Sequence, residues 1–218
     1  LSNLNNAPIA KLPLDERLLS LPKIIFFYMY TFLFPANLTI SQHWVVQSIN
    51  MPDFFLPLFF DLFFFSLLAA GLFYIYKYHK KDLRSYLFFL IWFIISLSLY
   101  LQIIPLDMTV AERWFYIPMV GMLGMIGVIV QTVKVKPSAK SLLIFIIIII
   151  IACFSLRVMV RNSNWSNALA LYSHDAQINK DSFDLENQLA GQFSVAGKYD
   201  EALNHSQRAI ELEPHDAR

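Results

Sequence analysis

The stretch Leu-Leu-Ile-Phe-Ile-Ile-Ile-Ile-Ile-Ile-Ala-Cys occupies residues 142–153, and the chain carries no charged side chain between Ser141 and Arg157. A helix rises about 1.5 Å per residue, so this run with its flanks is long enough to cross a hydrocarbon core of roughly 30 Å. The stretch therefore predicts a membrane-spanning helix. The sequence turns polar after it, which predicts that a membrane region is followed by a region outside the bilayer.

The composition agrees with a membrane protein. Of the 218 residues, 57% are hydrophobic and only 15% are charged, which is too apolar for an ordinary soluble domain of this length. Residues 1–161 hold 13 Lys/Arg against 7 Asp/Glu, whereas residues 162–218 hold 4 against 9. This division predicts two regions in different surroundings, with the lipid bilayer as the first partner. No nucleic-acid partner is expected.

Four further apolar segments precede the isoleucine-rich one. The sequence predicts an all-α fold, a polytopic transmembrane helix bundle of about five spans at residues 17–34, 54–76, 86–104, 112–133 and 141–160. Prolines or basic residues close most of these segments, because a proline cannot continue a helix and basic residues favour the membrane surface. We expect a transmembrane domain over residues 1–161 and an extracytoplasmic helical region over residues 162–218.

The basic residues predict the orientation of the bundle, because Lys and Arg in short loops stay on the cytoplasmic side. Ten of them lie in the N-terminal lead-in and in the loops after the second and fourth spans: Lys11, Arg17, Lys23, Lys77, Lys80, Lys81, Arg84, Lys134, Lys136 and Lys140. The sequence therefore predicts a multi-pass protein with a cytoplasmic N-terminus. Five crossings then place residues 162–218 in the periplasm or lumen.

The polar tail matches one tetratricopeptide (TPR) unit, a helical hairpin of about 34 residues. Small side chains recur where two helices would touch, a glycine stands where the chain would turn, and a proline where the second helix would stop: Ala190, Ala202, Ala209, Gly197 and Pro214. Because one repeat alone is not stable, further repeats are expected. The pattern predicts a surface for a protein or peptide partner.

The most informative polar segment is the loop at residues 105–118. It sets Asp107, Glu112 and Arg113 at the predicted outer membrane surface, with three aromatic residues behind them. A guanidinium there suits the phosphate of a lipid-linked donor, and carboxylates suit the orientation of a hydroxyl acceptor. The alternative interpretation is structural, since Thr109 and Glu112 have the spacing of a capping box at the start of the fourth span.

Three further residues are candidates for substrate binding. Arg157 and Arg161 are four residues apart near the outer end of the fifth span, where they suit an anionic headgroup or a plain interfacial anchor. His43 lies in the predicted outer loop after the first span. Asp61 is an ionisable residue inside the second span, which indicates either a structural hydrogen bond or a catalytic role. No metal site, cofactor or catalytic nucleophile is predicted.

Three segments resemble a known family. Phe34-Pro-Ala-Asn-Leu38, Val110-Ala-Glu-Arg-Trp-Phe-Tyr-Ile-Pro118 and Arg161-Asn-Ser-Asn-Trp165, followed by TPR-like sequence, resemble multi-spanning GT-C-type glycosyltransferases with C-terminal repeats. These include the transmembrane and TPR-containing O-mannosyltransferases. The resemblance covers most of the chain and corresponds to the C-terminal portion of such proteins. It implies transfer of a sugar from a polyprenyl-phosphate donor to a protein or glycan hydroxyl at the outer surface.

The resemblance also implies an acidic catalytic pair in an early outer loop, and this sequence shows no such pair. Either the catalytic half lies before Leu1 or the chain is not an active transferase, so the sequence leaves enzymatic activity open. Two alternatives remain beside the glycosyltransferase. One is a TPR-tailed ligase or polymerase of the O-antigen type, and the other is a non-enzymatic, membrane-anchored TPR scaffold.

Overall fold

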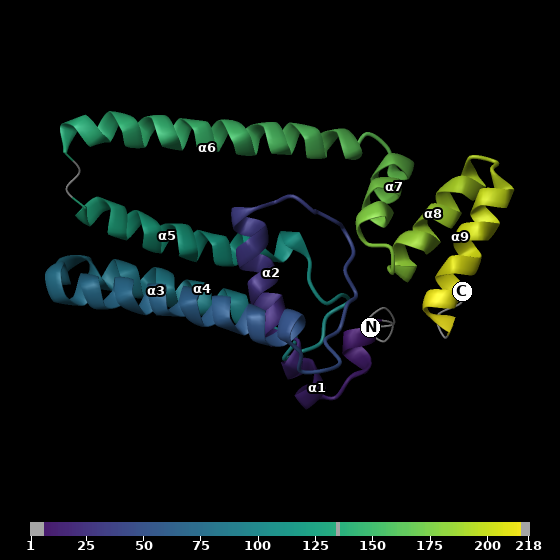
Figure 1. Cartoon of the computed structure of the whole chain (residues 1–218), viewed down its shortest axis with the longest axis horizontal. Helices are drawn as coiled ribbons and strands as arrows, with labels where there is room; N and C mark the ends of the chain where they lie inside the picture. The colour runs from purple at the N-terminus through teal and green to yellow at the C-terminus, as the bar shows by residue number, and fades with distance from the viewer. Residues whose placement is uncertain (1–6, 134–135, 215–218) are drawn as a thin grey trace. The chain divides into compact units, whose positions relative to one another are not determined.

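A computed structural model describes residues 7–133 and 136–214, and the chain is all-α, with no strand in these ranges (Figure 1). It divides into two compact units. The first, here called the bundle unit, comprises Leu1–Ala36 and Gln42–Lys134. The second, called the tail unit, comprises Asn37–Ser41 and Val135–Arg218. Lys134, one of the ten basic residues used to predict orientation, and the predicted extreme ends of both domains lie outside the described residues.

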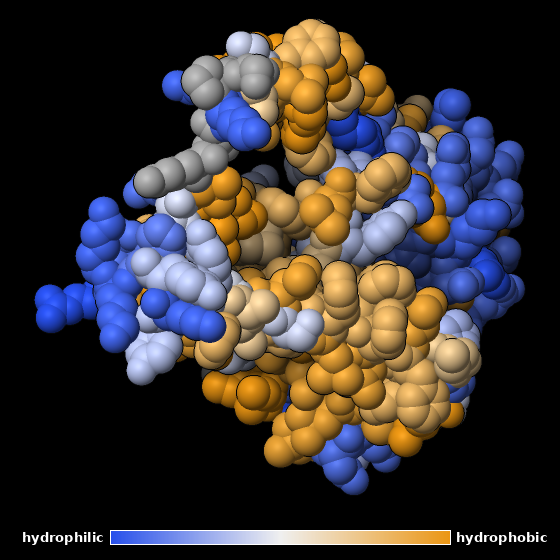
Figure 2. All heavy atoms as spheres, turned by 60° about the vertical axis from the view of Figure 1, so that its left-hand side comes forward, coloured by the Kyte–Doolittle hydropathy of each residue, from blue (hydrophilic) through white to orange (hydrophobic). Residues whose placement is uncertain are grey.

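Three antiparallel helices build the bundle unit. A π-helical turn at Met51–Phe55 leads into α3 (Leu56–Tyr78), which connects through a short 3-10 turn to α4 (Leu83–Ser98). A second 3-10 turn at Glu112–Phe115 starts α5 (Tyr116–Thr132), which packs along α4. Most of their large apolar side chains stay exposed, and Figure 2 shows hydrophobic side chains gathered over a broad area. Such a surface is typical of helices that face lipid.

The backbones of α4 and α5 come into close contact at Gly121. A Cβ atom at Gly121 would lie 2.7 Å from the backbone nitrogen of Phe93 and 2.8 Å from the carbonyl oxygen of Phe89. The two backbones can therefore approach this closely only because position 121 lacks a side chain. Close approach of this kind is how helices associate in lipid, where burial of apolar surface gives little driving force.

The N-terminal helices are short and do not run along the bundle. Helix α1 (Leu14–Leu19) is followed by α2 (Leu21–Leu33), and Figure 1 shows α2 running across the direction of α3, α4 and α5. The Lys23 ammonium at the start of α2 lies 2.8 Å from the Asp53 carboxylate at the start of α3. The ring of Phe32, near the end of α2, contacts Phe115, just before α5. Both ends of α2 thus lie at the same end of the bundle.

This arrangement corrects the prediction of a first crossing at residues 17–34. A helix of 13 residues is about 20 Å long, too short to cross a hydrocarbon core, and Lys23 divides the apolar run. Three helices in the described chain are long and apolar enough to span a membrane: Met51–Tyr78, Glu112–Thr132 and Ala139–Asn164. These three helices confirm that the chain has the length and composition of a multi-pass membrane protein. The predicted span at residues 86–104 corresponds to α4, whose 16 residues fall below that length.

The tail unit contains the isoleucine-rich helix and three shorter ones. Helix α6 (Pro137–Asn164) leaves the apolar side chains of its span exposed within the unit, as expected of a helix that requires lipid. It leads into α7 (Ala168–Ile178), and α8 (Phe183–Val195) then forms a hairpin with α9 (Tyr199–Leu212). Gly197 turns the hairpin with a φ of 74°, a left-handed value that favours glycine. The predicted boundary between residues 161 and 162 lies inside this unit and stays a prediction.

Candidate functional site

The loop between α4 and α5 is organised by Gln102. Its side chain is fully buried, and its amide nitrogen donates to the carbonyl oxygens of Met108 at 2.8 Å and Thr109 at 2.9 Å. Its side-chain oxygen accepts from the Leu106 backbone N–H at 3.0 Å. One glutamine thus replaces the backbone hydrogen bonds that an irregular segment lacks, which fixes the loop that carries Asp107 and Arg113.

Thr109 joins this loop to the loop that precedes α3. Its backbone N–H donates to the Gln42 carbonyl at 2.9 Å, and its hydroxyl donates to the Trp44 carbonyl at 2.6 Å. The capping-box interpretation of Thr109 and Glu112 is wrong, because the first helical turn begins at Glu112 itself and Thr109 is therefore not its N-cap residue. Ala111, in an extended conformation, is the residue that precedes the 3-10 turn, and no side chain caps it.

Arg113 presents its guanidinium beside aromatic rings. The side chain is exposed, its carbon Cζ lies 5.9 Å from the centre of the Trp114 ring, and Trp114 stacks on Tyr100 at 5.5 Å with an interplanar angle of 10°. Its Nη2 lies 4.0 Å from the sulfur of Met108, and a thioether sulfur is only a weak acceptor. The arrangement offers a cation on an aromatic platform at the surface of the unit.

A second cation lies at the same end of the bundle unit. Lys23 pairs with Asp53, and its ammonium also lies 4.7 Å from the centre of the Trp44 ring. Arg17, from α1, donates to the carbonyl oxygens of Gln102 at 3.0 Å and Ile103 at 3.3 Å. The sequence predicted that Arg17 and Lys23 lie on the side opposite the 105–118 loop. The structure places both residues at the same end of the bundle unit as this loop. The error follows from counting α2 as a crossing.

The other predicted residues of this unit have different settings. Asp107 is exposed on the α4–α5 loop, Glu112 begins the 3-10 turn and is half-buried, and His43 is half-buried in the loop held by Thr109. Asp107, Glu112, Arg113 and His43 thus belong to one unit, whereas Arg157 and Arg161 belong to the other. Asp61 is buried in α3, and neither carboxylate oxygen has a hydrogen-bond partner in the described part of the chain.

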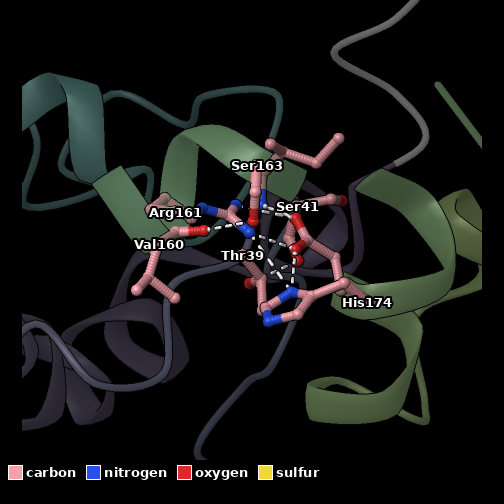
Figure 3. A network of polar contacts seen from close by, with 8 residues as sticks. Thr39, Ser41, Val160, Arg161, Ser163 and His174 are labelled. Carbon is pink, nitrogen blue, oxygen red and sulfur yellow. Dashed lines mark hydrogen bonds and ion pairs between the residues drawn. The ribbon is translucent and has the colours of Figure 1, made fainter. Parts of the chain in front are cut away.

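Arg161 is the centre of a buried polar network in the tail unit, shown in Figure 3. Its two terminal nitrogens bind the Asp175 carboxylate oxygens at 2.7 and 3.1 Å, and Asp175 is fully buried. Nδ1 of His174 lies 2.9 Å from Asp175 and 3.2 Å from Arg161. A protonated Nδ1 donates to the carboxylate, and an unprotonated one accepts from the guanidinium.

This network changes the interpretation of the two arginines predicted to bind headgroups. Arg161 is 8% exposed and committed to Asp175, so it is a buried ion-pair partner. Arg157, one turn earlier on α6, is half-buried. Sequence reasoning missed His174 and Asp175. A usable signal exists, because Leu171, Asp175 and Ile178 share one face of α7, and a carboxylate on an apolar face requires a partner.

No group of potential metal ligands occurs in the part of the chain that the structure describes. Comparisons of the chain with protein-family models, with curated proteins and with solved structures found no match.

Proposed function

We propose that this chain is the membrane part of a glycosyltransferase that uses a polyprenyl-phosphate-linked sugar, and that Arg113 binds the lipid phosphate at the extracytoplasmic surface. The observation that carries the proposal is the exposed Arg113 guanidinium beside the stacked Trp114 and Tyr100 rings. The resemblance of residues 110–118 to GT-C-type enzymes supports it. The helical tail is proposed to bind an acceptor or partner protein.

The chemistry of this place suits a lipid phosphate. A guanidinium forms two parallel hydrogen bonds to phosphate oxygens, and aromatic rings are favoured where hydrocarbon meets water. Arg113 shortly precedes the apolar helix that begins at Tyr116, so it stands at the expected depth of a headgroup. The Gln102 and Thr109 contacts hold this loop in one conformation, which reduces the entropy lost on binding.

The position of α2 supports a topology of four crossings, by α3, α4, α5 and α6. Seven basic residues surround the α3–α4 and α5–α6 connections in the sequence, Lys77, Lys80, Lys81, Arg84, Lys134, Lys136 and Lys140, whereas the N-terminal helices, the α4–α5 loop and the end of α6 hold six, Lys11, Arg17, Lys23, Arg113, Arg157 and Arg161. The end with seven, here called the basic end, is proposed to be cytoplasmic. Residues 162–214 then remain extracytoplasmic, as the sequence predicted, but the N-terminal helices lie on that side as well.

Labelling with a membrane-impermeant maleimide tests this topology. In a Cys153→Ser background, a cysteine replaces Glu16, Lys80 or Tyr199, all of which are exposed. Intact vesicles with the extracytoplasmic face outward should label Glu16→Cys and Tyr199→Cys, and Lys80→Cys only after permeabilisation. Labelling of Glu16→Cys only after permeabilisation would restore the odd number of crossings.

Binding of polyprenyl phosphate to the purified chain in nanodiscs tests the site, with tryptophan fluorescence as the signal. Arg113→Ala should weaken binding by about tenfold or more, since a hydrogen-bonded charge contributes about 1.5–3 kcal/mol. Arg113→Lys should have an intermediate effect, because it keeps the charge and loses the planar fork. Arg84→Ala, also exposed but at the basic end, is the matched control.

Uncharged polyprenol separates recognition of phosphate from recognition of the hydrocarbon chain. Arg113→Ala should leave binding of polyprenol unchanged. Equal weakening of the binding of both ligands, or unchanged binding of polyprenyl phosphate, would remove Arg113 from the site.

The non-enzymatic scaffold is the second candidate, because the tail carries an exposed helical hairpin and the described loops hold no acidic pair. Lipid-phosphate binding together with sugar transfer by the chain would exclude it.

A further inference from the structure

A short extended segment of the chain lies in the tail unit although both its neighbours in sequence belong to the bundle unit. Residues Asn37–Ser41 contact α7 and α8. Thr39 is 2% exposed and Ser41 is 5% exposed, so two hydroxyl side chains of this segment are buried. The residues on either side, Ala36 and Gln42, are assigned to the other unit.

The helices hold this segment largely by its backbone. The Ile40 N–H donates to Oδ2 of Asp175 at 2.8 Å, and the Asn179 side chain donates to the Ser41 carbonyl at 2.9 Å. The Ser41 hydroxyl donates to Oδ2 of Asp184 at 3.2 Å. A donor and an acceptor of consecutive residues are therefore both matched by side chains, which is how a helical surface can bind an extended peptide.

Arg161 holds the Asp175 carboxylate in the orientation that accepts the Ile40 N–H. The two carboxylate oxygens accept from Arg161, one of them also accepts from the Ile40 N–H, and Nδ1 of His174 lies 2.9 Å from the other. A carboxylate has about four acceptor positions, and these four contacts fill them. The carboxylate cannot rotate without breaking the ion pair, so it is preorganised to receive a backbone N–H.

We propose that α7 and α8 form a binding site for an extended peptide that carries Ser or Thr hydroxyls, and that residues 37–41 occupy this site in cis. A partner peptide with the pattern Thr-apolar-Ser makes the same three contacts and competes with the internal segment. The inference rests on the part of the proposed function that assigns partner binding to the tail, and it is independent of the lipid-phosphate site.

The internal segment has an advantage over any separate peptide. A tethered segment acts at an effective concentration in the millimolar range, so three hydrogen bonds suffice to hold it. An external peptide at low concentration therefore competes poorly with the internal segment, and its binding is measured best when that segment is removed. The site is therefore tested in the full-length chain after replacement of residues 37–41 by Gly-Gly-Ser-Gly-Gly, which keeps the chain length. The same replacement at residues 46–50, which lie in the bundle unit, is the control.

The probe is a fluorescein-labelled synthetic peptide with the sequence of residues 36–42, measured by fluorescence anisotropy. We expect saturable binding to the 37–41 replacement, and no binding to the parent chain or to the control replacement. Circular dichroism and thermal unfolding establish that the variant is folded. An unfolded tail unit, or a folded variant that does not bind the peptide, would overturn the proposal, because the segment would then be a permanent part of the fold.

Two changes test the assigned contacts. N-methylation at Ile40 of the peptide removes the donor to Asp175 and should weaken binding by about tenfold or more. N-methylation at Leu38, whose N–H contacts neither helix in the described structure, should have a smaller effect. Asn179→Ala in the opened chain should weaken binding by about two- to tenfold. Equal effects of the two N-methyl groups would contradict recognition through the Ile40 N–H.

Discussion

The bundle unit and the tail unit are held together by different means. In the bundle unit α4 and α5 meet at Gly121, where a missing side chain allows two backbones to touch. In the tail unit a buried ion pair joins Arg161 and Asp175, and hydrogen bonds support it. Helices in lipid gain little from burying apolar surface, so their association depends on close packing of complementary surfaces. Small helices in water can instead use directional, charge-assisted bonds to select one arrangement.

Arg161→Ala should give the largest effect and would show that the tail unit depends on charge. Removal of the arginine leaves Asp175 buried without its counter-ion, which costs about 3–5 kcal/mol of unfolding free energy. Thermal unfolding and proteolysis of the tail in the full-length chain measure it. Arg208→Ala, which breaks only exposed ion pairs with Asp181 and Glu211, should change stability by less than about 1 kcal/mol.

The double variant Arg161→Met with Asp175→Leu sharpens this test. Both charges are then replaced by apolar groups, so most of the lost stability should return. A double variant as unstable as Arg161→Ala would mean that the contact to the Ile40 N–H, and not the ion pair, supports the unit.

Gly121→Ala should destabilise the bundle unit by about 1–3 kcal/mol, because the new methyl group meets backbone atoms of α4 that cannot rotate away. Unfolding in detergent, followed by tryptophan fluorescence, measures the change. Gly127→Ala is the matched control on the same helix, since nothing lies within 4 Å of the place that its Cβ atom would occupy. Equal behaviour of the two variants would contradict close contact between α4 and α5.

Asn167→Ala removes the N-cap of α7 and tests how far local bonds support the tail unit. The Asn167 side-chain oxygen accepts from the Ala170 N–H at 2.8 Å, and loss of such a cap costs about 1 kcal/mol. Hydrogen exchange at the first turn of α7 should accelerate. Asn187→Ala, an exposed change on α8, should leave exchange in α7 unchanged.

Lys23→Ala should have the smallest effect and tests whether charge matters in the bundle unit. Lys23 and Asp53 are 33% and 36% exposed, so their ion pair contributes less than about 1 kcal/mol and weakens with salt. The melting temperature in detergent at low and high salt measures the contribution. A loss as large as that of Gly121→Ala would show that the end of the bundle at which α3 begins, like the tail, depends on ion pairs.

The sequence predicts the long helices well because hydrophobic length is a local property. Residues 142–153 indicate α6, and Gly197 marks the turn of the α8–α9 hairpin. The prediction for α2 is wrong because hydropathy records how apolar a segment is and not the direction in which it runs. Only contacts such as Lys23 with Asp53 reveal that it lies across the other helices.

The candidate site is predictable in part. Arg113 and its aromatic neighbours can be identified because they are adjacent in sequence. The ion pair of Arg161 with Asp175, and the Thr109 hydroxyl bound to Trp44, join residues from different elements and are fixed only by the fold. No spacing rule would find them, although the acid on the apolar face of α7 indicates that a cation lies opposite.

The contact at Gly121 has a consequence for biosynthesis. Helix α4 has 16 residues and is not among the helices that qualify to span the bilayer alone, whereas the two helices beside it are. In the proposed topology of four crossings, the retention of α4 in the membrane therefore relies on neighbours that are synthesised before and after it. The translocon would have to hold α3 and α4 until α5 emerges from the ribosome, so that the three enter the lipid as one assembled unit.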